Sequence, residues 1–309
     1  MLVGPTASGK SAAGMALAKR LDGEIVSIDS ALVYRGMDIG TAKPTPAEQA
    51  QVPHHLIDLI APTETYSVAR FLTDCRAAID GIRARGRLPL LVGGTMMYAN
   101  ALVHGLSDVP PTDAAVRAQV QARCAIEGIA ALHAELMRVD PVTAMRLPPT
   151  DTQRITRALE VWMLTGTPMS ALFGRRRSVL SDLELLIVRW VPESRVWLHL
   201  RCEERLRAMF AQGLLEEVVQ LRERYPLRAD LPSMRCVGYR QVLDVLEGRE
   251  PSEALFERAL FATRQLAKRQ LTWLRSFPGH GVASDAPDAL TTLEALLAPY
   301  YLARGVAPS

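Results

Sequence analysis

The chain has 309 residues, of which 49% are apolar and 22% charged, so it is long enough to bury one or two cores. This composition excludes a disordered chain, and no apolar run reaches the length of a membrane span. We expect no signal peptide, and four scattered cysteines without zinc spacing predict reduced thiols in a cytoplasm. The net charge of +3 does not by itself indicate a class of partner.

The first motif is an eight-residue phosphate-binding loop, G-x-x-x-x-G-K-[ST]. Its glycines let an anion approach the backbone, whose N–H groups form a nest for phosphate oxygens. A helix is expected from Ser11 to Leu21, and its N-terminal end adds positive charge. Only three residues precede the motif, which predicts a clipped first strand. The alternative is a glycine-rich turn without function. The motif comprises Gly4, Pro5, Thr6, Ala7, Ser8, Gly9, Lys10 and Ser11.

Two further strands are predicted, over residues 24–28 and 88–92. The first ends at Asp29, where an acid of a parallel sheet faces the ligand crevice, although a capping role is the alternative. The second ends in Gly93-Gly94-Thr95, where phosphate-loop ATPases place an aspartate that holds Mg²⁺. Asp29 is therefore the remaining candidate acid at the crevice. Residues 34–44 form a polar, glycine-rich loop.

The middle of the chain is helical. Residues 66–85 read as an amphipathic helix, and residues 113–177 as a helical insertion that proline residues punctuate. Within it, Arg154 and Arg157 share one helix face. The run Arg175-Arg176-Arg177 is either a solvated loop or a phosphate contact. The predicted fold is a phosphate-loop α/β core of parallel strands, made of residues 1–112 and 178–309, with this insertion as a second domain.

The C-terminal third returns to strand character at residues 185–191, with a short further strand predicted at residues 197–200. A long helix is expected over residues 203–224, and another over residues 252–275. Residues after Gly279 are expected to be peripheral.

The helix over residues 252–275 carries a one-sided basic stripe. Arg264, Lys268 and Arg275 are spaced by four and seven residues, and Trp273 lies beside them. Such a stripe is typical of nucleic-acid backbone contact, with a solvated surface helix as the alternative. Residues alone leave open a small-molecule kinase and a nucleic-acid-modifying transferase.

Eight motifs, in order over about residues 1–275, resemble the bacterial tRNA dimethylallyltransferases. They are GPTASGKS at residues 4–11, DSALVYRGMDIGTAK at 29–43, HHLID at 54–58, YSVARF at 66–71, GGTMMY at 93–98, DTQRITRALEV at 151–161, VGYRQ at 237–241 and RQLAKRQLTWLR at 264–275. The resemblance implies transfer of a dimethylallyl group from dimethylallyl diphosphate to N6 of the adenine just 3′ of the anticodon, in tRNAs that read codons beginning with U.

The resemblance also implies roles for residues of the crevice. The catalytic set is Asp29, Lys10 and Thr95, with Asp29 as general base on the N6 amine. The loop then holds a prenyl diphosphate and not ATP. Lys10, the loop N–H groups and Mg²⁺ stabilise the diphosphate leaving group, with the Ser11 hydroxyl as the metal ligand.

The implied tRNA contacts lie in six places along the chain, and the target base is expected to be flipped into the crevice. They are Asp29, Ser30, Ala31 and Leu32; Thr95; Arg117; Gln153, Arg154, Ile155, Thr156 and Arg157; and Arg235, Cys236, Val237, Gly238, Tyr239 and Arg240. On the last helix they are Lys268, Arg269, Gln270, Leu271, Thr272, Trp273, Leu274 and Arg275.

Departures from the family pattern are few. Ser11 stands where threonine is common, and no zinc-finger spacing is present, so no zinc is expected. We expect a monomer that binds the tRNA anticodon stem-loop and no membrane. Three alternatives stay open: a phosphate-loop small-molecule kinase, an isopentenyltransferase that acts on free adenine nucleotides, and a nucleotide-switched RNA-binding protein without enzyme activity.

Overall fold

The computed structural model describes residues 1–107, 109–173 and 178–302. The chain divides into two compact units, one made of residues 1–103 and 179–309 and the other of residues 104–178. The Arg175-Arg176-Arg177 run lies outside the described residues.

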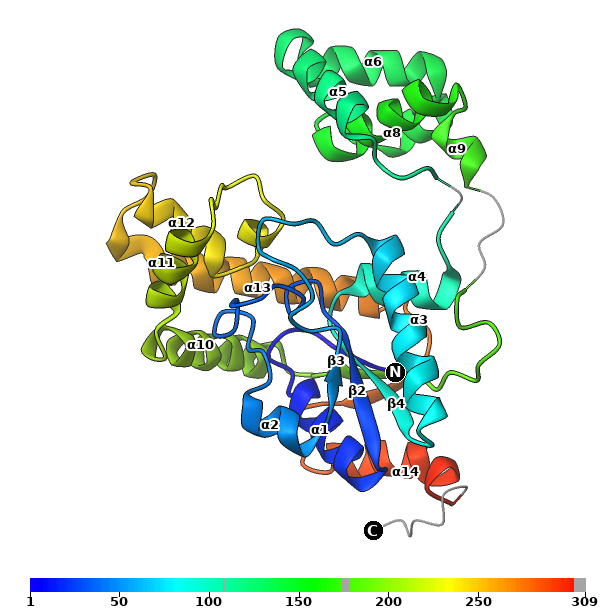
Figure 1. Cartoon of the computed structure of the whole chain (residues 1–309), viewed down its shortest axis with the longest axis vertical. Helices are drawn as coiled ribbons and strands as arrows, with labels where there is room; N and C mark the ends of the chain where they lie inside the picture. The colour runs from blue at the N-terminus through cyan, green and yellow to red at the C-terminus, as the bar shows by residue number, and fades with distance from the viewer. Residues whose placement is uncertain (108, 174–177, 303–309) are drawn as a thin grey trace. The chain divides into compact units, whose positions relative to one another are not determined.

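The first unit is built on a parallel sheet with the strand order β3-β2-β4-β1-β5-β6. Figure 1 labels β3, β2 and β4 of this sheet. All of its described pairings are parallel, so the carboxyl ends of the strands meet at one edge, where open α/β sheets bind ligands. The strands are β1 (Leu2–Val3), β2 (Gly23–Ile28), β3 (His54–His55), β4 (Leu88–Gly93), β5 (Val188–Val191) and β6 (His280–Ala283).

Helices cover both faces of this sheet. The first part of the chain supplies α1 (Lys10–Arg20), α2 (Pro46–Gln51), α3 (Val68–Ala84) and α4 (Met96–His104). The last part supplies α10 (Arg195–Ala211), α11 (Leu214–Arg224), α12 (Tyr239–Leu246), α13 (Leu255–Leu274) and α14 (Ala289–Leu302), with short 3₁₀ turns at Ser233–Arg235 and Ser252–Ala254.

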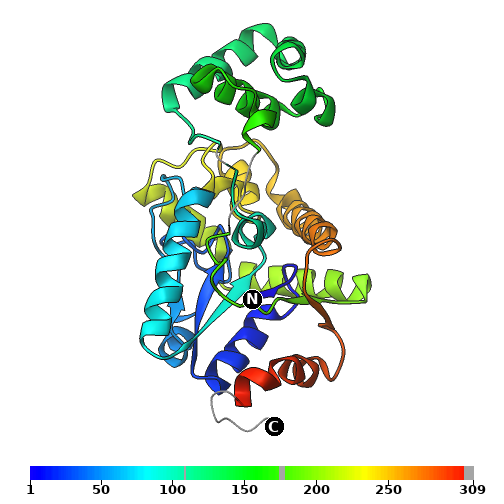
Figure 2. The ribbon, with the colours of Figure 1, turned by 90° about the vertical axis from the view of Figure 1, so that its right-hand side faces the viewer.

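Neighbouring residues of each strand serve the two faces, because strand side chains alternate. Ile25 and Leu2 pack with Leu17 of α1 and Leu293 of α14, and both ribbon views place these two helices together (Figures 1 and 2). Val26, Val3 and Leu91 point to the other face. Their core includes residues of α3, α4, α10, α11, α12 and α13.

The secondary-structure elements named for the described part of the second unit are all helices. It contains α5 (Ala114–Glu127), α6 (Ile129–Val139), α7 (Pro141–Arg146), α8 (Thr152–Thr165) and α9 (Met169–Leu172). Val120, Leu132, Leu136, Ile155 and Leu159 form its own buried core. The predicted insertion, residues 113–177, falls within this unit.

Two predictions for the region before α12 are wrong. Residues 197–200 belong to α10 and not to a strand, because Ser194 caps the helix by accepting a hydrogen bond from the Trp197 N–H. The helix expected over residues 203–224 is two helices. Gly213 between them has a left-handed φ of 99°, which ends α10 and starts α11 in a new direction.

The prediction that residues after Gly279 are peripheral is also wrong. β6 extends the sheet by pairing with β5, from Val188 opposite His280 to Val191 opposite Ala283. Leu293 of α14 is 1% exposed. The sequence signal was weak because an edge strand of four residues is short, and because α14 is apolar along most of its length and so carries little periodicity.

A buried carboxylate ties the start of β2 to the end of α3. Glu24 is 2% exposed. Its Oε1 accepts hydrogen bonds from Arg85 at 3.0 Å and from Arg87 at 3.4 Å, and its Oε2 accepts one from Arg85 at 2.6 Å. His55 Nε2 also lies 2.6 Å from Glu24 Oε2. Hydrogen bonding, to Arg85 above all and to His55, lowers the pKa of Glu24 to about 2. This contribution to stability is therefore present above about pH 4.5 and is lost as the pH falls toward 2.

We expect Glu24→Gln to lower the free energy of unfolding by about 2 kcal/mol at pH 7, because it replaces the charged partner of these arginines. The difference from wild type should shrink as the pH falls from 4.5 to 2. Urea unfolding across this range measures it. Glu223→Gln, at an exposed position, is the matched control and should follow wild type at every pH. A difference for Glu24→Gln that does not change with pH would contradict the assignment.

Candidate active site

The phosphate-binding loop connects β1 to α1 at the carboxyl edge of the sheet. Ala7 and Gly9 have left-handed φ values of 62° and 84°, and α1 begins at Lys10 directly after them. The Trp190 indole of β5 supports the loop by donating a 2.8 Å hydrogen bond to the Ser8 carbonyl. The loop thus has the turn and the helix N-terminus that bind phosphate in such motifs.

Lys10 is a buried cation within this loop. Its Nζ donates to the Pro5 carbonyl at 3.2 Å, and the side chain is 8% exposed. Burial, assisted by the nearby charge of Arg205, lowers the pKa of Lys10 to about 8, although Asp29 acts in the opposite direction. The ammonium is therefore held in a site that favours the arrival of an anion.

Arg205 of α10 is a second cation at the loop, and the sequence reasoning missed it. Its guanidinium donates to Thr6 Oγ1 at 3.4 Å and to the Thr41 carbonyl at 3.5 Å. Burial lowers its pKa, and Asp29 opposes this effect. No sequence signal separates Arg205 from Arg201 and Arg207, since only the packing of α10 decides which arginine points inward.

Asp29 follows β2 at the same edge. Its Oδ1 accepts a 2.9 Å hydrogen bond from the Ala31 N–H, which fixes the carboxylate in a local turn. Its charge acts on both Lys10 and Arg205, so the acid and the two cations share one site. A carboxylate so placed is able to accept a proton beside a bound anion.

Thr95 connects the ends of β2 and β4. Its backbone N–H donates to the Ile28 carbonyl at 3.1 Å, and its Oγ1 accepts from the Ser30 N–H at 3.0 Å. The same hydroxyl donates to Ser30 Oγ at 3.2 Å. The structure therefore brings the predicted residues Lys10, Asp29 and Thr95 to one edge, with Thr95 holding the segment that follows Asp29.

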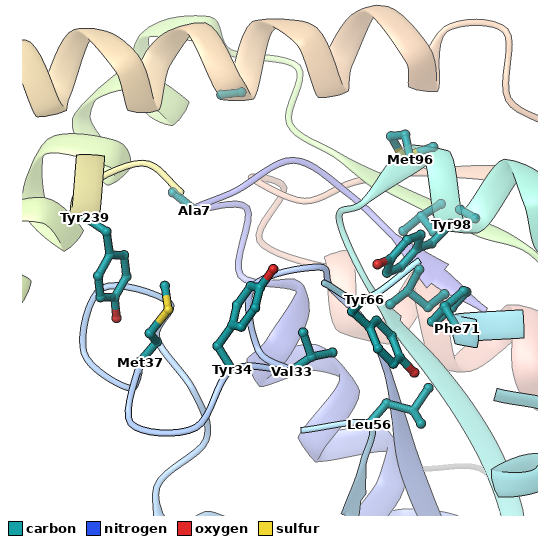
Figure 3. Close-up of a cluster of buried hydrophobic side chains, with 14 of the residues drawn as sticks. Ala7, Val33, Tyr34, Met37, Leu56, Tyr66, Phe71, Met96, Tyr98 and Tyr239 are labelled. Carbon is teal, nitrogen blue, oxygen red and sulfur yellow. The ribbon is translucent and has the colours of Figure 1, made fainter. Parts of the chain in front are cut away.

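Aromatic side chains lie close enough to Asp29 for its charge to act on the Tyr98 phenol. Figure 3 shows Tyr34 of the polar loop near Ala7 of the phosphate loop, with Tyr98 and Tyr66 close to Phe71. Phe71 and Tyr98 stack with ring centroids 4.1 Å apart. Burial raises the pKa of Tyr34 to about 12 and also raises that of Tyr98, so both phenols stay neutral. Burial, and then the charge of Asp29, raises the pKa of the Cys236 thiol to about 12.

Glu217 of α11 fixes the polar loop over residues 34–44, and the sequence reasoning missed it. Its carboxylate accepts hydrogen bonds from three successive loop N–H groups, of Asp38, Ile39 and Gly40, at 2.9, 2.7 and 3.4 Å. It also accepts from the Tyr239 hydroxyl at 2.5 Å. The buried Tyr239 of the VGYRQ motif therefore holds the loop and does not face solvent.

Helix α13 presents different residues to the two sides. Lys268, Arg269, Thr272, Trp273 and Arg275 are exposed, whereas Leu274 is buried and Leu271 is half-buried. Gln270 faces the phosphate loop and bonds to the backbone of Thr6 and Gly94. Arg264 of the predicted basic stripe pairs with Glu203 of α10 at 3.1 Å, so the exposed basic surface begins at Lys268.

Known proteins are similar in sequence to this chain along nearly its whole length. A sequence model of the IPP transferase family matches residues 32–277. The tRNA dimethylallyltransferase of Acidovorax sp. (strain JS42) is 57% identical over 300 residues, covering 94% of this chain and 93% of that protein.

The chain belongs to the IPP transferase family.

Solved structures agree with this membership. The full-length tRNA isopentenylpyrophosphate transferase of Bacillus halodurans is 36% identical, with a TM-score of 0.68 over 98% of this chain and 96% of that one. A eukaryotic dimethylallyltransferase acting on tRNA is 26% identical, with a TM-score of 0.81 over 100% of this chain and 80% of that one. The predicted resemblance and the predicted α/β fold are therefore confirmed.

The second unit of this IPP transferase carries six of the predicted RNA-binding residues. Arg117, Gln153 and Arg154 are exposed, but Arg154 also pairs with Asp151 at the start of α8. Ile155 belongs to the buried core of this unit, and Thr156 is half-buried. Arg157 is half-buried, donating to the Pro110 carbonyl and, at 3.2 Å, to Glu160. Their contact with RNA stays a prediction.

The predicted RNA-binding residues of the VGYRQ region also differ in exposure. Arg235 and Arg240 are exposed, Cys236 and Val237 are half-buried, and Gly238 and Tyr239 are buried. Of the segment after β2, Ser30 is exposed, and Ala31 and Leu32 are half-buried. Contact of these residues with RNA stays a prediction as well.

A metal ion at this site would depend on oxygen donors of the ligand. Ser11 lies exposed in the first turn of α1, next to Lys10. Among the residues that the structure describes, no three His, Cys, Asp or Glu side chains are grouped to hold a metal ion by themselves. A hydroxyl with phosphate oxygens is a donor set that suits a hard cation such as Mg²⁺.

The length and hydropathy of the helices bear on whether one of them could cross a membrane. No helix within the described ranges is both long and apolar enough to cross a bilayer.

The pKa of Lys10 predicts how anion binding depends on pH. Lys10 is charged below about pH 8 and neutral above it, so affinity for an alkyl diphosphate should fall as the pH rises from 7.5 to 9.5. The loss should approach tenfold for each pH unit above 8 if the charged form alone binds. Titration calorimetry with the ligand, whose own phosphates are ionised above pH 7, measures it.

Lys10→Arg should remove the decline above pH 8, since an arginine stays charged throughout. Lys19→Gln, at an exposed position on the same helix, is the control and should keep the decline. An affinity that is independent of pH in the wild-type protein would contradict the shifted pKa.

Proposed function

We propose that this chain transfers a dimethylallyl group from dimethylallyl diphosphate to N6 of the adenine 3′-adjacent to the anticodon, in tRNAs that read codons beginning with U. The family makes the chain a prenyltransferase, and its relatives are named for action on tRNA. The observation that carries the proposal is the shared site of Lys10, Arg205 and Asp29, which combines two cations for a diphosphate with a carboxylate for a proton.

The donor diphosphate binds at the phosphate loop. Lys10 and Arg205 neutralise its charge, and the N–H groups at the start of α1 donate hydrogen bonds to its oxygens. The Ser11 hydroxyl, together with diphosphate oxygens, would hold Mg²⁺, which would supply positive charge to the leaving group. β4 ends in Gly93-Gly94-Thr95, so the aspartate that phosphate-loop ATPases use there is missing.

The reaction exchanges one bond for another. The bond between the allylic carbon and the diphosphate oxygen breaks, and its electron pair leaves with the diphosphate. The N6 nitrogen forms the new bond to that carbon and gives up one proton, which the Asp29 carboxylate accepts. Thr95 supports this step by fixing the Ser30 backbone next to Asp29. Lys10 and Arg205 hold the diphosphate while its negative charge grows.

The dimethylallyl chain lies against the aromatic region near Asp29. Tyr34 and Tyr98 supply apolar ring faces, and their neutral phenols do not compete with Asp29 as bases. The ring faces also stabilise positive charge that develops on the allylic carbon. Burial of this region keeps water from the reacting carbon.

The tRNA anticodon stem-loop binds through exposed basic side chains. Lys268 and Arg269 of α13 and Arg275 at its C-cap supply phosphate contacts, and the helical second unit adds Arg117 and Arg154. The target adenine leaves the loop stack to reach Asp29, as base-modifying enzymes require. The chain acts as a monomer in the cytoplasm, where its tRNA substrates are.

Labelled substrates test the reaction directly. We expect label from dimethylallyl diphosphate to enter an unmodified tRNA that reads a U-starting codon, in the presence of Mg²⁺. Parallel reactions offer AMP as acceptor, or labelled ATP as donor. Transfer to AMP would favour an enzyme of free nucleotides, and phosphoryl transfer from ATP would favour a kinase.

Asp29→Asn tests the general base. The asparagine oxygen can still accept from the Ala31 N–H, so the local turn is kept, but the side chain cannot take the N6 proton. We expect kcat to fall by about 10²–10⁴-fold while affinity for the diphosphate donor changes little.

Asp230→Asn is the matched control for this variant. Asp230 is exposed and pairs with Arg228 two residues away, so turnover should stay at the wild-type level. An Asp29→Asn variant with normal turnover would show that another group removes the proton.

A further inference from the structure

Gln270 of α13 forms hydrogen bonds with the phosphate loop and with the segment that follows β4. Its Oε1 accepts a 2.8 Å hydrogen bond from the Thr6 N–H, and its Nε2 donates a 2.8 Å hydrogen bond to the Gly94 carbonyl. These partners are 264 and 176 residues away in sequence. A neutral amide satisfies both, because it carries one acceptor and one donor group.

The contact leaves little room for a side chain at Gly94. A Cβ on Gly94 would lie 2.7 Å from Gln270 Nε2, 3.0 Å from the Gly4 carbonyl oxygen and 3.5 Å from the Lys10 side chain. Gln270, the phosphate loop and the end of β4 therefore meet at one point, directly beside Lys10.

The hydrogen bond to Thr6 fixes a peptide that matters for Lys10. The N–H of Thr6 and the carbonyl of Pro5 belong to one peptide plane and point in opposite directions when the bond is trans. The N–H is held by Gln270, and the Pro5 carbonyl accepts from Lys10 Nζ at 3.2 Å and from the Ser8 N–H at 3.4 Å. The orientation of this peptide thus sets where the Lys10 ammonium rests.

Gln270 also differs in direction from its neighbours on the helix. Lys268, Arg269, Thr272 and Trp273 are exposed, whereas Gln270 is half-buried and engaged with two backbone groups. Direct contact with RNA would require breaking both hydrogen bonds and would leave the Thr6 N–H without its partner, which is unfavourable.

We propose that Gln270 is a positioning residue for the diphosphate donor: it ties the Pro5–Thr6 peptide of the phosphate loop to α13, and so holds Lys10 in place, instead of contacting tRNA. The inference rests on the proposed function for the identity of donor and acceptor. Helix α13 would then have two roles. Its exposed basic side chains would contact RNA, and its half-buried Gln270 would hold the phosphate loop.

Gln270→Met tests this role because methionine keeps the length of the side chain and removes both hydrogen bonds. We expect the affinity for dimethylallyl diphosphate, measured by calorimetry without RNA, to fall about tenfold. Affinity for an anticodon stem-loop RNA, measured without donor, should stay within about twofold of wild type, as expected for a side chain without a phosphate contact. In turnover, KM for the donor should rise while KM for tRNA is unchanged.

Two further variants guard against a fold defect. Gln270→Glu keeps an acceptor for the Thr6 N–H but places a carboxylate oxygen against the Gly94 carbonyl, so donor affinity should fall here as well. Gln265→Met makes the same substitution at another half-buried position, five residues earlier on a different face of α13, and should bind both substrates like wild type. Thermal unfolding of all three variants confirms that each one is folded.

Three outcomes decide the inference. Weakened donor binding with intact RNA binding supports it. Weakened RNA binding with intact donor binding would make Gln270 an RNA contact, and wild-type values for both would remove any role. Failure of the proposed function is a separate result, because the wild-type protein would then not transfer the prenyl group, while donor-site binding by the variants is measured without turnover.

Discussion

The site depends on close approach of backbone segments at the carboxyl edge of the sheet. A Cβ on Gly93 would lie 2.1 Å from the Ile28 carbonyl oxygen, and one on Gly4 would lie 2.4 Å from that of Trp190. The ends of β1, β2, β4 and β5 meet here without room for side chains. Because the backbones approach so closely, the phosphate loop, Asp29 and Thr95 lie within one small region.

Segments from the C-terminal half of the chain hold this edge from outside. Trp190 of β5 bonds to Ser8, Arg205 of α10 bonds to Thr6, and Gln270 of α13 bonds to Thr6 and Gly94. Each contact joins residues more than 170 positions apart in sequence. A phosphate loop is a local motif, but in this protein its support is assembled from distant segments. The polar loop is held in the same way by Glu217 of α11.

Electrostatics at the site follow from partial burial of unlike charges. Burial disfavours the charged forms of Lys10 and Arg205, and Asp29 partly restores them. A diphosphate would add negative charge among these cations and leave the carboxylate to act on a proton. The neutral phenols of Tyr34 and Tyr98 keep the apolar wall of the site free of further charge. Under the proposed function, this arrangement of charges would serve both the diphosphate leaving group and the N6 amine that gives up a proton.

The sequence by itself determined the local features: the phosphate loop, the strand that ends at Asp29, the Gly93-Gly94-Thr95 turn and the family. These are short motifs whose spacing carries their geometry. Tertiary structure decided which side chain points where. Arg205, Glu217 and Trp190 have no signature, because helix and strand packing selects one residue among similar neighbours. The tertiary structure also turns Gln270 toward the phosphate loop, although it lies in a segment predicted to bind RNA. The C-terminal segment adds a strand to the sheet, which the sequence did not predict because long-range pairing leaves little local periodicity.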